Sequence, residues 1–219
     1  MSSMKAEINE CLCANLEKGM DAWLLQSGFV RRKNTLVYAR ELADALQRIE
    51  ITMEIHPADR PDSAAAIYPW LEISMDAVEK LIIEMMGGDL SPLPGPAGGT
   101  LREPIEFTSA KAAPARWLIF QPDSLPGVVG EMKSFMQRWT LPFLDTYSNP
   151  KGICDAYDRG DARIINDLAQ KIRVAAAMVL CGRGADAMDV MEQWFGKSGP
   201  RKRFQRIFDY LTMCRPGEL

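Results

Sequence analysis

The stretch that decides the fold is "RIEITMEI" at residues 48–55. Apolar and polar residues alternate along it, the apolar set being Ile49, Ile51, Met53 and Ile55 and the polar set Arg48, Glu50, Thr52 and Glu54. A period of two with one charged side indicates a β-strand that buries one face and exposes the other. Because antiparallel sheets commonly leave one face in water, the sequence predicts an antiparallel sheet at the centre of the fold.

Upstream of this strand, apolar residues recur at steps of three and four and predict one helix from about Met4 to Gln26. Gly19 lies inside the apolar stripe, where a glycine costs about 1 kcal/mol relative to alanine. We therefore expect another element to approach the helix closely at this position. Gly28 follows the last periodic residue and predicts a left-handed cap, with Phe29 or Val30 packing back onto the helix end.

Three basic residues, Arg31, Arg32 and Lys33, follow the predicted cap. We expect them to be solvated residues of the turn that leads into a strand near residues 36–38. Phosphate-binding loops use the free N–H groups of a helix N-terminus, whereas this segment follows a C-terminus. The pattern therefore favours a turn over a phosphate site.

The region after the central strand predicts a loop, "HPADRPDS" at 56–63, and then a strand over Ile67–Ile73. Pro69 lies inside that strand and predicts an edge position or a bulge. Two further strands are expected at Ile105–Phe107 and Trp117–Phe120. The second of these is apolar on both faces, which is typical of a central strand.

Helical patterns fill the rest of the chain. Ser74 is the predicted N-cap of a helix that runs through Met86 and ends at Gly87. A second helix is expected over 125–139. Three apolar stripes at 164–179, 188–195 and 204–211 predict helices separated by turns, with Gly182 and Gly196 as caps.

Together these patterns predict an α+β fold. An antiparallel sheet of about five strands, packed with helices, would occupy a domain at 1–149. An all-helical C-terminal region at 150–219 would pack on that domain.

Composition limits the classes of function. The chain has 219 residues, with 26 Lys and Arg against 29 Asp and Glu, so its net charge is −3. Such a chain has no overall attraction for nucleic acid or an anionic membrane. The polar N-terminus lacks an apolar signal core, and no apolar run approaches the roughly 18 residues of a membrane span. Its five scattered cysteines are typical of reduced thiols, so we expect a cytoplasmic protein that has no membrane association.

Catalytic and cofactor motifs are weak in this sequence. His56 is the single histidine and falls in a predicted loop, and "GPAGGT" at 95–100 lacks the lysine of a nucleotide-binding loop. No G-x-S-x-G nucleophile pattern occurs. We assign no catalytic residue and no cofactor.

An acidic cluster leaves one catalytic alternative open. Asp155, Asp158, Asp161 and Asp167 lie within "DAYDRGDARIIND" at 155–167. Two-metal nucleases and hydrolases use carboxylates of this kind, so a metal site at Asp155, Asp158 and Asp161 is the alternative. Asp161 also fits as an N-terminal capping acid of the next helix.

A basic cluster supplies candidates for partner binding. Its members, Arg201, Lys202, Arg203 and Arg206, alternate with Phe204 and Phe208. We expect them near a helix start, where cations oppose the helix dipole. A solvated face is the first interpretation, contact with a protein partner the second, and a nucleic-acid-associated subunit a further alternative. With Arg31, Arg32 and Lys33, these residues are the candidate contacts for a partner.

The segment from the first helix through "GFVRRKNTLVYAR" at 28–40, the alternating strand, and "MQRWTLPFLDTYSNP" at 136–150 together resemble a group of uncharacterised bacterial domains. That group begins with a helix, a Gly-Phe-basic turn and an antiparallel sheet. Some of its members resemble immunity proteins encoded beside toxins. The resemblance covers about residues 5–150 and implies a binding module without catalytic residues. We therefore expect a protein partner, and an immunity or accessory role beside a toxin or defence system.

Overall fold

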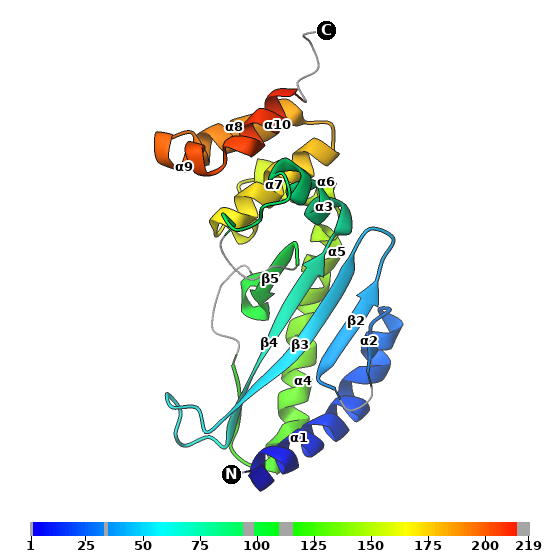
Figure 1. The fold of residues 1–219 in the computed structure, drawn as a ribbon. Coiled ribbons are helices and arrows are strands. Elements are labelled where there is room, and N and C mark those ends of the chain that lie inside the picture. Colours follow the sequence, from blue (N-terminus) through cyan, green and yellow to red (C-terminus); the bar gives the residue numbers. More distant parts are fainter. Residues whose placement is uncertain (1, 33–34, 94–98, 110–115, 214–219) are drawn as a thin grey trace. The chain divides into compact units, whose positions relative to one another are not determined.

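The structure is a computed structural model that describes residues 2–32, 35–93, 99–109 and 116–213. The fold is α+β, with an antiparallel sheet and with helices dominating the C-terminal region, as predicted (Figure 1). The chain divides into two compact units. Unit 1 comprises residues 1–72 and 102–145, and unit 2 comprises residues 73–101 and 146–219. Residues 73–101 therefore lie outside the domain at 1–149 that the sequence predicts, because helix α3 (Asp76–Met85) packs against α7 (Leu168–Leu180) and α10 (Gln205–Met213).

The predicted first helix is present and contains one wide turn. It consists of α1 (Ser2–Leu16), the π-helical turn η1 (Glu17–Asp21) and α2 (Ala22–Gln26). A Cβ atom on Gly19, inside the wide turn, would lie 2.9 Å from Val129 Cγ1 of helix α4 (Leu125–Phe135). The expected close approach is thus made by α4, and glycine is what allows it.

The predicted cap of this helix is also confirmed. Gly28 has a φ of 83°, in the left-handed region that favours glycine. The N–H groups of Gly28 and Phe29 donate to carbonyl oxygens of the last helical turn, and Phe29 is buried. The helix therefore ends in a closed turn, and the chain leaves it directly into the first strand.

The sheet has the strand order β1-β2-β3-β4-β5, and β6 also pairs with β4. Its strands are β1 (Val30–Arg31), β2 (Val37–Glu41), β3 (Leu46–Ile55), β4 (Ala65–Ser74), β5 (Leu101–Pro104) and β6 (Trp117–Ile119). The antiparallel register of β2 and β3 places Tyr38 opposite Ile49. The alternating stretch that predicted a strand is β3.

One face of the sheet is buried and one is open, as the alternation predicts. Tyr38, Ile49, Ile51, Ile67 and Leu71 are buried, and they occupy alternate positions on three neighbouring strands. Helices α1 and α4 run behind the sheet in the view of Figure 1. The intervening positions on the same strands form the opposite, open face.

Three strand predictions need correction. The expected strand at Ile105–Phe107 is wrong, because β5 ends at Pro104 and residues Ile105–Thr108 form the 3₁₀ turn η2. The Thr108 hydroxyl donates to the Ile105 carbonyl oxygen at 2.6 Å and closes that turn. Proline cannot continue a ladder of N–H donors, so the strand stops where the turn begins.

The other two corrections concern positions within the sheet. Among the described strands β6 pairs with β4 alone and stops at Ile119, so it is not central, and Phe120 is 52% exposed. Pro69 was expected at an edge or a bulge, and the edge position is wrong because β4 has neighbours on both sides. The pairing with β6 covers Ala65, Ala66 and Ile67, so Pro69 lies beyond that paired stretch, where its missing N–H is tolerated.

The helix that the sequence predicts over 125–139 is longer than expected. It begins with the 3₁₀ turn η3 (Pro122–Ser124), continues as α4 and the π-helical turn η4 (Met136–Thr140), and ends as α5 (Leu141–Tyr147). Segment 141–147 thus extends the helix, and Asn149 caps the next one. Its side chain accepts a hydrogen bond from the Gly152 N–H at 2.8 Å.

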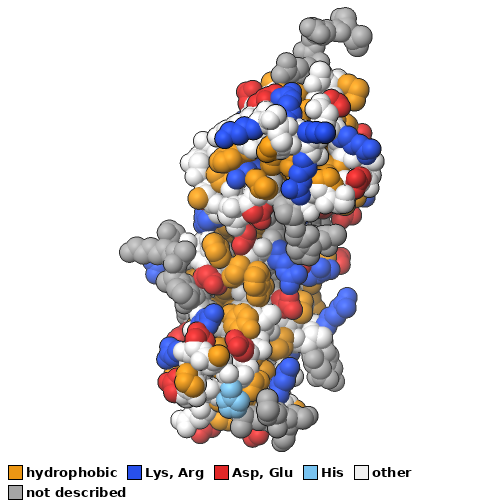
Figure 2. Space-filling view, turned by 60° about the vertical axis from the view of Figure 1, so that its left-hand side comes forward, with side chains coloured by type: hydrophobic (Ala, Val, Ile, Leu, Met, Phe, Trp, Pro, Cys, Tyr) orange, Lys and Arg blue, Asp and Glu red, His pale blue; other side chains and the backbone are white. Residues whose placement is uncertain are grey.

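Unit 2 is helical. After α3 it contains α6 (Pro150–Asp158), the 3₁₀ turn η5 (Ala162–Ile164), α7, α8 (Gly184–Phe195), α9 (Ser198–Arg203) and α10. Gly87 and Gly182, both with positive φ, follow α3 and α7, and Gly196 ends α8, as predicted. Over α8–α10, the face in Figure 2 shows Lys and Arg side chains around exposed hydrophobic ones. Within the described residues, no helix combines the length and apolarity that a bilayer crossing requires.

The predicted cap of α3 is wrong. Ser74 is the last residue of β4, and Met75 precedes the helix. The Met75 N–H instead donates to Thr100 Oγ1 at 2.8 Å, so a residue 25 positions away satisfies it. Because β4 runs on through Ser74, this serine is too early in the chain to cap the helix.

Candidate binding surface

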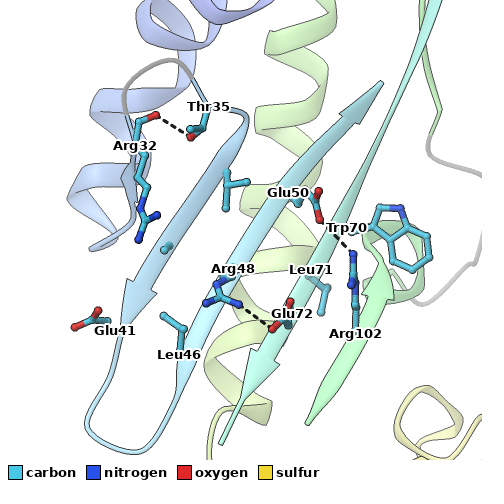
Figure 3. A pocket seen from close by; sticks show the side chains of 12 residues that line it. Arg32, Thr35, Glu41, Leu46, Arg48, Glu50, Trp70, Leu71, Glu72 and Arg102 are labelled. Carbon is cyan, nitrogen blue, oxygen red and sulfur yellow. Dashed lines mark hydrogen bonds and ion pairs between the residues drawn. The ribbon is translucent and has the colours of Figure 1, made fainter. Parts of the chain in front are cut away.

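A hollow of about 460 Å³ lies on the open face of the sheet in unit 1 (Figure 3). It extends across β2, β3, β4 and β5. Its lining residues are Arg32, Thr35, Val37, Ala39, Glu41, Leu46, Arg48, Glu50, Trp70, Leu71, Glu72 and Arg102.

Strand alternation explains why these residues share a surface. Odd-numbered positions of β2 and even-numbered positions of β3 point to the open face, because their neighbours are buried on the other. The register pairs Val37 with Glu50 and Ala39 with Arg48. The short side chains of Val37 and Ala39 leave space between longer ones, and this difference in length makes the hollow.

Charges of alternating sign surround the apolar centre. Arg48 Nη1 lies 3.1 Å from Glu72 Oε1, and Arg102 Nη2 lies 3.3 Å from Glu50 Oε2 (Figure 3). Exposed ion pairs of this kind stabilise a protein by about 0–1 kcal/mol. Since so little stability depends on them, these four side chains can exchange partners when another molecule binds.

Trp70 supplies the large apolar surface of the hollow. The Arg102 guanidinium lies 5.8 Å from the centroid of the Trp70 ring, a cation–π distance. Tryptophan and arginine are enriched among the residues that dominate protein–protein binding energy. The ionisable residues of the lining are arginines and glutamates, which suit recognition of a polypeptide.

The basic turn after the first helix behaves differently from expectation. Arg31 was expected to be solvated, but this is wrong, because its side chain is 9% exposed. Arg31 Nη2 donates to Asp21 Oδ2 at 2.7 Å, and the Tyr38 hydroxyl donates to Asp21 Oδ1 at 2.6 Å. Arg31 thus joins the first helix to the sheet. Arg32 is exposed and lines the hollow, whereas Lys33 lies outside the described residues.

In this Asp21–Arg31–Tyr38 cluster, the pKa shifts favour a charged carboxylate beside a neutral phenol. Burial alone would raise the pKa of Asp21, but hydrogen bonds from Arg31 and Tyr38 outweigh it, so the pKa of Asp21 is lowered. Burial, and then the hydrogen bond to Asp21, raise the pKa of Tyr38. The carboxylate therefore stays charged and the phenol neutral at neutral pH, which suits a structural cluster.

The second basic cluster spans the end of one helix and the start of the next, because Arg206 is the second residue of α10. Arg201, Lys202 and Arg203 occupy the last turn of α9, where cations favour the helix dipole. The expectation that the dipole opposes them is therefore wrong. Arg201 forms an ion pair with Glu192, and Arg206 Nη1 donates to the Met86 carbonyl oxygen at 3.2 Å.

The acidic cluster is divided among separate cations. Asp155 pairs with Lys151 at 2.5 Å and Asp158 with Arg183 at 2.8 Å. Asp161 accepts from Arg163 Nη2 at 2.6 Å and begins η5, and Asp167 caps α7. Within the described ranges, no three carboxylate, thiol or imidazole groups are placed to hold a metal ion.

His56 lies in the loop that the sequence predicts. It is exposed, has a φ of 49°, and its backbone N–H donates to the Ala64 carbonyl oxygen at 3.0 Å. The residues that sequence reasoning missed are Trp70, Glu72 and Arg102. The even-numbered positions of β4 were the available signal, since they must share the face of Arg48 and Glu50 once β3 and β4 pair.

Comparison with known proteins returns no match, whether the chain is set against protein-family models, curated proteins or solved structures.

Proposed function

We propose that this protein is a non-catalytic protein-binding module, and that it binds its partner through the hollow on the open face of the sheet. The observation that carries the proposal is the composition of that surface. Trp70 of β4 and the short Val37 and Ala39 of β2 line the hollow on either side of β3, and the ion pairs Arg48–Glu72 and Glu50–Arg102 lie among them. A central apolar anchor within a polar rim is the usual anatomy of a protein interface.

The surface suggests what the partner presents. An apolar side chain would fill the space over Val37 and Ala39 and contact the Trp70 ring. Charged side chains beside it would take over the contacts of Arg48 and Glu72, whose pairing costs little to exchange. The partner is therefore a folded protein or peptide with mixed charges, since the lining offers three arginines and three glutamates besides its apolar residues.

A more specific role rests on the resemblance of residues 5–150 to immunity-like bacterial domains. We propose that the partner is a toxin or defence component and that the complex forms in the cytoplasm. Cys11, Cys13, Cys154 and Cys181 are free thiols, which is consistent with a reducing compartment.

The test exchanges the charges of one ion pair. Tagged wild-type protein and the double variant Arg48→Glu with Glu72→Arg are used to capture partners from nuclease-treated lysate of the native host. The double variant keeps an arginine–glutamate pair at positions 48 and 72, but the positive and negative charges have exchanged positions. We expect a stoichiometric protein partner with the wild type and its loss with the double variant, while the melting temperature stays unchanged.

Two results would contradict the proposal. One is a partner that both proteins recover equally well, which would place binding elsewhere on the molecule. The other is the absence of any stoichiometric partner. In the captured pair, identification of the partner as a toxin by its activity tests the immunity role separately.

A further inference from the structure

A second hollow, of about 300 Å³, lies on the helices of unit 2. We call it the α8–α9 groove, and its lining consists of Leu168, Trp194, Phe195, Gly199, Pro200, Arg203 and Phe204. Its floor is the pair Phe195 and Phe204, two buried rings in edge-to-face contact with centroids 4.8 Å apart. Leu168 and Trp194 form its walls and are 41% and 37% exposed.

The local sequence explains why the groove is open. Helix α8 ends at Phe195, and the chain turns at Gly196 and Lys197 into the short helix α9. Gly199 in the first turn of α9 has no side chain, and a Cβ atom there would meet no atom within 4 Å. Gly199 lines the groove without a side chain, and a larger residue at position 199 would have room to project from the groove wall.

The rim of the groove is positively charged. Lys171 Nζ lies 3.8 Å from the centroid of the Trp194 ring, and the Arg203 guanidinium lies 5.3 Å from that of Phe204. Lys197 and Lys202 are exposed on the same connection. Residues 193–208 contain five basic residues and no Asp or Glu, although the whole chain has a net charge of −3.

Two acids near this rim already have partners. Glu192 forms an ion pair with Arg201, whose guanidinium also lies 4.2 Å from the Phe208 ring. Asp167 accepts the Gln170 backbone N–H at 2.7 Å as the cap of α7. Two cations, Lys171 and Arg203, therefore lie against aromatic rings of the groove, and Lys197 and Lys202 are exposed in the same segment of the chain.

We propose that the α8–α9 groove binds an acidic peptide segment that inserts one aromatic or large aliphatic side chain between Leu168, Trp194 and Phe204. The apolar side chain would contact the floor rings, and flanking carboxylates would contact Lys171, Lys202 and Arg203. A hollow of about 300 Å³ is at the lower limit for small-molecule sites, so one or two side chains fill it better than a cofactor does. This site is separate from the sheet hollow, and neither proposal depends on the other.

The test uses the full chain and a defined probe. The probe is a fluorescein-labelled peptide in which a central phenylalanine is flanked by glutamates and aspartates, and its binding is followed by fluorescence anisotropy. Gly199→Leu fills the groove from its open side, and we expect it to weaken binding at least about tenfold. Gly127→Leu is the matched control, because Gly127 is also an exposed helical glycine whose Cβ would meet no atom within 4 Å.

A second variant separates charge from shape. Lys171→Glu with Lys202→Glu reverses two rim charges, and we expect at least about a tenfold loss of affinity and a weaker dependence on salt. A peptide with alanine in place of phenylalanine should bind at least about tenfold more weakly to the wild type. Melting curves of each variant verify that the fold is intact.

Three outcomes would overturn the proposal. Equal peptide affinities of the Gly199→Leu and Gly127→Leu variants would show that the groove is not the binding site. Absence of peptide binding at concentrations up to about 1 mM would show that the groove has no useful affinity for acidic segments. Preferential binding of a single-stranded oligonucleotide that Gly199→Leu abolishes would assign the groove to nucleic acid instead. The sheet-face variant Arg48→Glu with Glu72→Arg should bind the probe normally, so failure here and failure of the proposed function can be told apart.

Discussion

Each unit contains a cluster of one aspartate, one arginine and one tyrosine. The numbers of residues that separate the three along the chain differ between the two clusters. In unit 1 Asp21 accepts hydrogen bonds from Arg31 and from the Tyr38 hydroxyl, and the Arg31 guanidinium lies 5.9 Å from the Tyr38 ring. In unit 2 Asp161 accepts from Arg163 and the Tyr147 hydroxyl, and the guanidinium lies 5.7 Å from the Tyr147 ring.

The difference lies in what each cluster joins. The first connects a helix to strands ten and seventeen residues later, and its arginine side chain is 9% exposed. The second connects residues two and fourteen positions apart, and its arginine side chain is 34% exposed. In unit 1 the more buried member of the ion pair is the arginine, which joins the first helix to the sheet, whereas in unit 2 it is Asp161, which is 14% exposed and is bonded to an arginine two residues away.

The largest loss of stability should come from removing the arginine of the Asp21–Arg31–Tyr38 cluster. Arg31→Ala leaves the Asp21 carboxylate and the Tyr38 hydroxyl without their cation, and we expect a loss of about 3 kcal/mol in the free energy of unfolding. Arg32→Ala is the matched control, because Arg32 is the exposed neighbour, and it should change stability by less than about 0.5 kcal/mol. Urea unfolding measures both, and equal losses would remove the distinction between the units.

Acid should weaken the second cluster. Burial would raise the pKa of Asp161, but hydrogen bonds from Arg163 and Tyr147 outweigh it and lower the pKa to about 2. Because the folded pKa lies below the unfolded value of about 3.9, the stabilisation is complete above pH 3.9 and is lost as the pH falls towards 2.

This shift corresponds to about 2.5 kcal/mol at most. The difference in unfolding free energy between the wild type and Asp161→Asn should therefore shrink between about pH 4 and pH 2 and stay constant from pH 5 to pH 7. Denaturant unfolding at each pH measures it. A difference that does not change below pH 4 would contradict the cluster.

The smallest stability effect should come from the close approach at Gly19. Alanine favours a helix interior by about 1 kcal/mol, yet its Cβ would lie 2.9 Å from Val129 Cγ1. We expect Gly19→Ala to destabilise the wild type by about 1 kcal/mol. In a Val129→Ala background the same change should become neutral or stabilising, which a double-mutant cycle measures. Destabilisation of equal size in both backgrounds would show that the contact does not matter.

Local patterns in the sequence were sufficient for the elements that depend on near neighbours. Strand β3 follows from its alternation, the cap at Gly28 from its place after the last apolar residue, and helices α3, α7, α8 and α10 from their apolar stripes. Helices α6 and α9 had no predicted stripe. The turn at residues 105–108 was mistaken for a strand because the Thr108 hydroxyl that closes it has no periodic signature.

Long-range contacts account for what the sequence did not reveal. The pairing of Arg31 with Asp21 requires the wide turn η1 to direct the carboxylate towards the sheet, and a basic turn looks the same with or without such a partner. The sheet hollow depends on β3 and β4 lying side by side, which brings Trp70 and Glu72 onto the face of Arg48. Part of that surface, Arg48 and Glu50, was visible as the polar side of one strand.

The most direct test of the central claim is the affinity of the captured partner for two aromatic variants, measured by isothermal titration calorimetry. Trp70→Ala removes the aromatic side chain that lines the sheet hollow, and Phe120→Ala removes an exposed aromatic side chain that does not line it. We predict at least about a tenfold weaker affinity for Trp70→Ala and no change for Phe120→Ala. Wild-type affinity for Trp70→Ala would contradict the assignment of the open sheet face as the binding surface.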